Sequence, residues 1–279
     1  MKGTKIKRRV YHLILKYVLL VILFFITILP IFIMISTSLK TRVDAFSIPP
    51  VWFFKPTLNG YRVVFDSLPF NRYFINSCII GILTTVFTCL FGVMAAYAIV
   101  RHKFFGRKAL LKVILLLRMI APVVLIIPIY IIWSKLGVVG SRNSVIFSYV
   151  AMNLPLAIWI SRTFINEVPI ALEEAAIIDG CNDLRIFSSI IAPLIKPGLV
   201  VVAIFTFRTC WNEFPLALVI TDRFSRTLPV AITLFISTTG VDWSAISAIA
   251  TIIAIPAFIF TFTSSKHIIK GLAAGAVKG

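Results

Sequence analysis

The chain has 279 residues, of which 59% are hydrophobic and only 14% are charged. Soluble domains are roughly half apolar and about a quarter charged. The excess of apolar residues is gathered in long runs, which indicates a membrane protein. The formal net charge of +18 does not indicate nucleic-acid binding. The basic residues stand mostly at the ends of apolar runs, where lipid head groups lie, and no recognition motif is present.

The basic N-terminus is followed by a charge-free run from Tyr17 to Leu39. This run is too long for the apolar region of a signal peptide and has no small-residue cleavage site, so we interpret it as a retained first span. Six segments are expected to cross a bilayer as helices, since one crossing takes about 20 residues. They lie at 13–38, 73–100, 110–134, 144–163, 198–220 and 244–265. Prolines inside them predict kinks, at Pro30, Pro122, Pro128, Pro155 and Pro256.

Lysine and arginine indicate the orientation. If the N-terminus is cytoplasmic, the cytoplasmic segments and span ends hold 17 of these residues and the outer segments hold 9, which predicts that both termini are cytoplasmic. The predicted parts are a cytoplasmic N-terminus (1–12), a six-helix transmembrane domain (13–265) with a cytoplasmic loop (164–197), and a cytoplasmic tail (266–279). The outer loop at 39–72 is expected to be either an aromatic membrane anchor or a partner-binding segment.

The segment at 169–197 is a polar island in this apolar chain. Five of the chain's ten acidic residues lie in it or just before it. Pro169 suits the first turn of a helix, and Gly180 stands where a helix-ending residue takes the left-handed conformation. Asn182 or Asp183 can then cap a second helix. The sequence therefore predicts two short helices joined at a sharp glycine turn, which would serve as a docking element on the water side of the membrane.

This island resembles the EAA motif of ABC importer permeases. Glu174-Ala-Ala is followed after three residues by Gly180, and after nine more by Ile190-x-x-Pro193. Ala192 departs from the motif, which usually has leucine there, and the change weakens one packing contact. Other segments resemble the carbohydrate-uptake branch, specifically its maltose/trehalose-type second permease subunit, a binding-protein-dependent transport inner membrane component. They are Met119–Pro122, Leu154–Trp159, Trp211–Phe214, Thr227–Pro229 and Gly271–Gly279.

The resemblance implies an all-α membrane protein with the type I ABC importer permease fold, six transmembrane helices and a cytoplasmic coupling (EAA) helix. It implies that the subunit forms a pathway for a di- or oligosaccharide or polyol together with a second permease subunit. A substrate-binding protein on the outer side would deliver the sugar. A dimer of ATPase subunits would bind the ATP and Mg, so the chain itself would need no cofactor, catalytic residue or metal site. The implied location is the bacterial cytoplasmic (inner) membrane.

The resemblance also implies which residues contact the ATPase. In that family the coupling helix fits a cleft on the ATPase subunit, and Glu174 matches the acidic residue that pairs with a basic residue there. The C-terminal tail reaches the ATPase dimer interface, which in this chain would be Val277, Lys278 and Gly279. The residues expected to form the coupling site are Glu173, Glu174, Ala175, Ala176, Asp179 and Gly180.

Charged residues inside the spans are expected near the middle of the membrane, where they normally face a bundle interior or a water-filled cavity. Glu213 and Arg208 do not share a helical face, because five residues at about 100° each leave them about 140° apart. Glu213 is therefore expected to pair with Arg118 or with another subunit. Two interpretations stay open: a polar pathway in which Trp211 offers a flat face to a sugar ring, or an interhelical lock. The residues concerned are Arg118, Arg208, Asn212 and Glu213, with Trp211 added in the first interpretation.

Two other classes of function are weighed against the importer. A membrane hydrolase is disfavoured, because the three histidines have no catalytic or metal partner at an informative spacing. An ion-coupled secondary transporter would favour an acidic relay within the membrane, for which Glu213 alone is thin support. The chain has no P-loop that would bind ATP. Its four cysteines form no C-x-x-C pair and therefore indicate neither zinc nor a disulfide framework.

Overall fold

The computed structural model describes residues 2–237 and 240–276, with side chains for residues 13–237 and 240–262. The regular secondary structure of the described residues is helical apart from one antiparallel pair of two-residue strands, β1 (Ile236–Ser237) and β2 (Gly240–Val241). It forms two compact units. One comprises Met1–Leu68 and Ile232–Ile252, and the other comprises Pro69–Ala231 and Ile253–Gly279.

The first unit contains the long helix α1 (Lys2–Ser38) and two short helices, α2 (Arg42–Phe46) and α3 (Asn59–Ser67). It also holds η3 (Ile232–Phe235), the strand pair and the start of α14 (Trp243–Ala276). The loop at 39–72 carries α2 and α3. The Thr57 amide in the middle of this loop donates to the Leu39 carbonyl at its start, at 2.8 Å.

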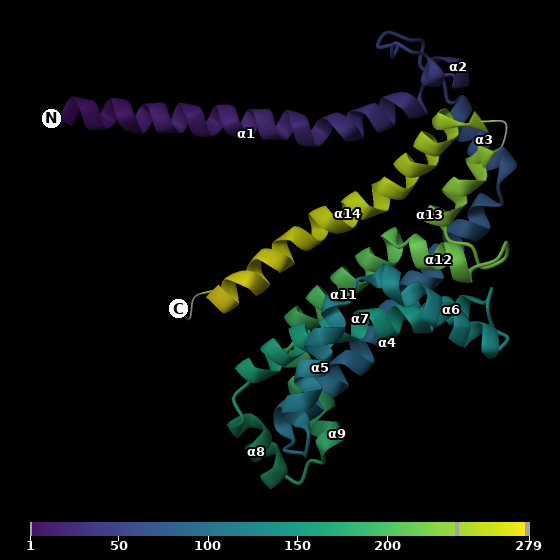
Figure 1. Ribbon diagram of the computed structural model, residues 1–279. Helices are drawn as coiled ribbons and strands as arrows, with labels where there is room; N and C mark the ends of the chain where they lie inside the picture. The colour runs from purple at the N-terminus through teal and green to yellow at the C-terminus, as the bar shows by residue number, and fades with distance from the viewer. Residues whose placement is uncertain (1, 238–239, 277–279) are drawn as a thin grey trace. The chain divides into compact units, whose positions relative to one another are not determined.

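The second unit is a helical bundle in which α4, α7 and α11 run side by side (Figure 1). A Cβ on Gly92 of α4 would lie 2.6 Å from the Cβ of Ala157 on α7, so the glycine is needed for this close approach. The helices of the unit are α4 (Phe70–Arg101), α5 (Arg107–Met119), η1 (Pro122–Leu125), α6 (Ile126–Lys135), α7 (Arg142–Glu167), α8 (Ala171–Ile178), α9 (Asp183–Ile186), η2 (Phe187–Ile191), α10 (Ala192–Leu194), α11 (Lys196–Asn212), α12 (Pro215–Ile220), α13 (Leu228–Ala231) and the end of α14.

Four of the predicted spans are continuous helices in the described residues, namely α1, α4, α7 and α14. The other two are bent pairs, so the expectation of six uninterrupted helices needs correction. In the third, α5 meets the segment Pro122–Lys135 at 100°. Ile120 and Ala121 are extended there, because the residue before a proline avoids the helical region and Pro122 has no N–H to continue the helix.

The predicted fifth span at 198–220 is also interrupted. Helix α11 ends at Asn212, and Pro215 opens the separate helix α12. At its other end, α11 is bent by 78° against the helical segment Asp183–Leu194. The break in the third span, before Pro122, and the break between α11 and α12 lie close together, since α6 contacts α12. Figure 1 shows α6 and α12 near one end of the second unit and α8 and α9 near the other.

Candidate functional site

The predicted glycine turn is present between α8 and α9. The Leu172 amide donates to the Pro169 carbonyl in the turn that precedes α8. Gly180 has φ +80°, and the Cys181 amide donates to the Ala176 carbonyl at 2.9 Å, which is the hydrogen bond that closes a helix at a left-handed glycine. The Asn182 side chain accepts from the Arg185 amide at 2.9 Å and caps α9. Two short helices and their sharp turn are therefore confirmed.

Helix α9 continues into five residues of π-helix, Phe187–Ile191, which the sequence analysis did not predict. Ile186 and Ile191 are 1% and 0% exposed and belong to a core cluster that also contains residues of α4 and α7. Single turns of π-helix occur frequently at functional sites. Here the turn fastens the segment after the glycine bend to the bundle.

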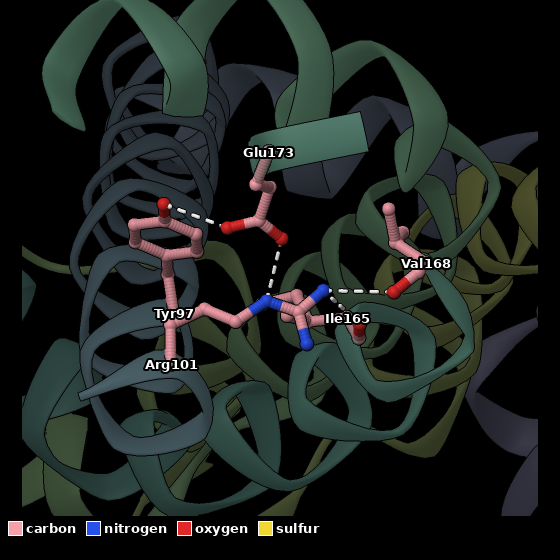
Figure 2. Close-up of polar contacts among 5 residues, drawn as sticks. All are labelled: Tyr97, Arg101, Ile165, Val168 and Glu173. Carbon is pink, nitrogen blue, oxygen red and sulfur yellow. Dashed lines mark hydrogen bonds and ion pairs between the residues drawn. The ribbon is translucent and has the colours of Figure 1, made fainter. Parts of the chain in front are cut away.

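Glu173 of α8 points into the protein (Figure 2). Its carboxylate forms an ion pair with the guanidinium of Arg101, at 2.5 Å between Nε and Oε1. The Tyr97 hydroxyl donates to the other carboxylate oxygen at 3.1 Å. The Glu173 and Arg101 side chains are only 7% and 12% exposed. Glu173 was expected among the residues that contact the ATPase, whereas the structure places its carboxylate inside this subunit.

Arg101 also holds the end of α7 (Figure 2). Its Nη2 donates to the carbonyl oxygens of Ile165 at 3.1 Å and Val168 at 2.9 Å. Carbonyls at a helix C-terminus have no partner within the helix, so a guanidinium is a suitable donor at this position. One side chain of α4 thus joins α8 and the end of α7. We call Tyr97, Arg101 and Glu173 the latch.

The opposite face of α8 is exposed. Glu174, Ala175, Asp179 and Gly180 are exposed, whereas Ala176 is buried against the bundle. Exposed apolar side chains of α8 and α9 accompany the acidic ones, and their part in this exposed surface was not predicted from the sequence. They are Leu172 (45% exposed), Ile177 (59%), Ile178 (86%) and Leu184 (71%). The remaining predicted contacts, Val277, Lys278 and Gly279, lie outside the described residues.

A second candidate site is a pocket of about 520 Å³ at the two span interruptions. The start of η1 and α6 provides one wall, and the junction of α11 and α12 provides the other. Three predicted pathway residues line it: Arg208, Asn212 and Glu213. Arg118 is exposed on the last turn of α5 and does not line this pocket.

Trp211 does not present a ring face to this pocket. It is 3% exposed, and its indole Nε1 donates to the Ile253 carbonyl at 3.0 Å. Its ring stacks on Phe207 with centroids 5.7 Å apart and meets the edge of Phe74. The expected flat sugar platform is therefore not found, and Trp211 packs α11 against its neighbours.

Glu213 has partners other than the expected Arg118. The Tyr149 hydroxyl donates to its carboxylate. The amides of Leu216 and Ala217 donate to it at 2.8 and 3.0 Å, so the side chain caps α12. Because Glu213 stands at the interruption between two helices, the angular argument from one continuous helix did not apply to it. The structure thus brings together Arg208, Asn212 and Glu213, and places Arg118 and Trp211 elsewhere.

Comparison with known proteins agrees with this architecture. The model of the family described as "Binding-protein-dependent transport system inner membrane component" matches residues 88–273. The chain is 34% identical to the diacetylchitobiose uptake system permease protein DasC of Streptomyces coelicolor, over 98% of this chain and 100% of that one. It is 38% identical to the trehalose/maltose transport system permease protein MalG of Thermococcus litoralis, over 82% and 84%.

A solved structure shares the fold. It is that of a bacterial ABC transporter that imports the acidic polysaccharide alginate. The match has a TM-score of 0.76 at 22% identity and covers 91% of this chain and 95% of that chain. Together with the family match over residues 88–273 and the long apolar helices, this likeness identifies a multi-pass membrane protein. The chain belongs to the family of binding-protein-dependent transport system inner membrane components, the permease subunits of ABC importers.

Proposed function

We propose that this chain is a permease subunit of a sugar importer, which carries a di- or oligosaccharide or a polyol. It pairs with a second permease subunit and receives its substrate from a binding protein on the outer side of the membrane. A dimer of ATPase subunits binds ATP and Mg, so this chain has no catalytic role of its own. The named substrates of the two sugar-transport relatives, at 34% and 38% identity, support the sugar as solute.

The observation that carries the proposal is the division of roles between neighbouring residues of α8. Glu173 points inward and is bound to Arg101, whereas Glu174 is exposed at the start of the same helix. A partner that pairs with Glu174 and covers the apolar side chain of Ile178 holds the outer face of α8. Its motion passes through the latch to α4 and α7. Glu173 is thus a positioning residue, and Glu174, Ala175, Asp179 and Gly180 form the contact surface for the ATPase, with Val277, Lys278 and Gly279 as a second contact.

The excess of lysine and arginine on the segments that include both termini supports a cytoplasmic location for these termini and for α8. The membrane is the bacterial cytoplasmic membrane. The pathway runs past Arg208, Asn212 and Glu213, which line the pocket at the span interruptions. Arg118 and Trp211 have no part in it, because one lies away from the pocket and the other is buried in packing.

The test is a charge reversal on α8 with a matched control. Glu174→Lys is expected to prevent copurification of the ATPase subunits and to abolish uptake, while the protein still inserts into the membrane. Glu167→Lys makes the same change at another exposed position, at the end of α7, and is expected to retain both. Normal ATPase binding by the Glu174→Lys variant would contradict the docking role. An active transporter that copurifies no ATPase and depends on an ion gradient would favour the secondary-transporter alternative.

A further inference from the structure

The pocket lined by Arg208 lies where two spans are interrupted. Pro122 and Val123 line it from the break in the third span, and Glu213 and Pro215 line it from the break between α11 and α12. Non-helical backbone at membrane depth is tolerated where it lines a cavity or is buried in protein. Transporters that bind substrate near the midplane build the site from such interrupted helices. The position of the pocket therefore suits a substrate site.

Arg208 is the cationic side chain of this pocket. It is exposed, and within the described ranges no hydrogen bond or ion pair involves its guanidinium. It lies one turn before the C-terminal end of α11, which is at Asn212, and within the described residues the five N–H donors of its side chain have no protein acceptor. Glu213 does not serve as its counter-ion, because the Glu213 carboxylate is held by the Tyr149 hydroxyl and by the amides at the start of α12.

The other pocket walls cannot supply a counter-charge. Pro122, Val123, Ile126 and Pro215 are apolar, and the Asn212 amide already donates to the Arg208 carbonyl at 2.9 Å. When a transporter closes around its substrate, water leaves the site, and an unpaired cation in a low-dielectric cavity is unfavourable. A neutral sugar offers hydroxyl acceptors but no compensating charge. A carboxylate or sulfonate offers both, because its oxygens match the fork of a guanidinium.

We infer that the sugar carried by this importer bears a carboxylate or sulfonate group and that Arg208 binds this group in the pocket between the two span interruptions. The inference rests on the proposed function and narrows its solute class. It differs from the interhelical-lock interpretation, in which Arg208 only sets packing, and from a further possible role as an ion pair with a carboxylate of the second permease subunit. Because an ion pair with a partner subunit and a salt bridge with a substrate both need Arg208, the experiment must separate them.

The experiment uses the whole assembly, purified through a tag on this chain and reconstituted in lipid nanodiscs without the binding protein. Equilibrium binding is measured for matched probes: glucose with glucuronate, maltose with maltobionate, and glucose with 6-sulfoquinovose. In the unmodified assembly, at least one acidic probe is expected to bind tenfold or more tightly than its neutral counterpart. The pair that responds tells carboxylate from sulfonate.

Three variants locate the effect. Arg208→Gln is expected to remove the preference for the acidic probe, and Arg208→Lys is expected to keep part of it. Arg118→Gln removes an exposed arginine that does not line the pocket and is expected to keep the preference in full. Equal binding of acidic and neutral probes by the unmodified assembly, no binding of any probe, or an unchanged ratio in Arg208→Gln would overturn the inference.

Loss of the second permease subunit from Arg208→Gln, with retention in Arg208→Lys, would also overturn it, since that result assigns Arg208 to the subunit contact. None of these results bears on the proposed importer, which stands or falls with copurification of the ATPase subunits. An assembly that contains the ATPase and binds neutral sugars as tightly as acidic ones would refute the acidic solute alone.

Discussion

Arg101 and Glu173 form a buried ion pair that ties the end of α4 to the first turn of α8. The two residues are 72 positions apart in the sequence. The same guanidinium binds the last carbonyls of α7. In the proposed importer, displacement of α8 by an ATPase subunit would therefore reach two spans at once, through one side chain.

Replacement of Arg101 by methionine is expected to uncouple the importer. It leaves the buried Glu173 carboxylate without a cationic partner and with only the Tyr97 hydroxyl as a donor, and loss of one partner from a buried ion pair typically costs about 3–5 kcal/mol. ATP hydrolysis by the assembly should continue while sugar transported per ATP falls at least fivefold. The measurement is the ratio of sugar uptake to phosphate release in proteoliposomes, together with the thermal unfolding temperature.

Two further variants control this experiment. Lys108→Met removes an exposed cation near the start of α5 and is expected to leave the ratio unchanged. The double variant Arg101→Met with Glu173→Leu removes both charges and should recover much of the thermal stability, because no unpaired charge stays buried. If the double variant also recovered full coupling, apolar packing would suffice and the ion pair would not be required.

Gly180 is expected to tolerate alanine better than proline. A Cβ at this position meets no atom within 4 Å, so alanine costs only the strain of the left-handed conformation, about 1–2 kcal/mol. Proline cannot adopt φ +80° and also removes the amide that donates to the Ile177 carbonyl. Uptake should fall partly in Gly180→Ala and completely in Gly180→Pro, with both proteins inserted. Full uptake by Gly180→Pro would show that the turn is not needed for coupling.

The contact between Gly92 and Ala157 is expected to limit how closely α4 and α7 pack. Gly92→Ala places a methyl group 2.6 Å from the Ala157 Cβ, which forces the helices apart at a cost of about 1–3 kcal/mol. The thermal unfolding temperature of the detergent-solubilised subunit should fall. Adding Ala157→Gly removes the opposing methyl group and should restore part of the loss. No recovery in the double variant would mean that the damage arises elsewhere.

Glu213→Gln separates the two classes of transporter. The glutamine side-chain oxygen can still accept from the amides of Leu216 and Ala217, so the cap of α12 is retained in part. Uptake is expected to stay within about threefold of the unmodified level and to be insensitive to proton or sodium gradients. Abolished uptake in a fully assembled complex would instead indicate that Glu213 must ionise, as an acidic relay requires.

Local sequence rules were sufficient for the coupling turn. Gly180 and Asn182 act on the backbone within a few residues of their own positions, and the structure places both as those rules require. Pro169 was expected in the first turn of the helix but lies just before it, because α8 begins at Ala171. The inward direction of Glu173 could not be obtained in this way, because it depends on how α8 packs against the end of α4. Glu173 and Glu174 are adjacent residues of the same type, so the local sequence does not tell which one points inward. The distinction comes from Arg101, which is far away in the sequence and binds Glu173.

Hydropathy located the spans but not their interruptions. The segments around Pro122 and Pro215 are apolar enough to read as single helices, so the helix breaks before each proline gave no hydropathy signal. The proline at 122 was expected to produce a kink and instead opens a 100° bend. The wrong expectation for Trp211 has a similar origin, since its neighbours on other helices decide whether its ring is covered.

The convergence of three helix ends on Arg101 has a consequence for protein engineering. One design for a chimeric permease grafts a single surface loop onto a foreign scaffold so that the scaffold binds a different ATPase subunit. A graft of residues 169–193 alone would carry Glu173 without its partners Arg101 and Tyr97. The recipient scaffold must also provide arginine and tyrosine four positions apart at the end of the matching helix. Without them, the transplanted loop would bind the ATPase but would not be linked to the spans of the scaffold.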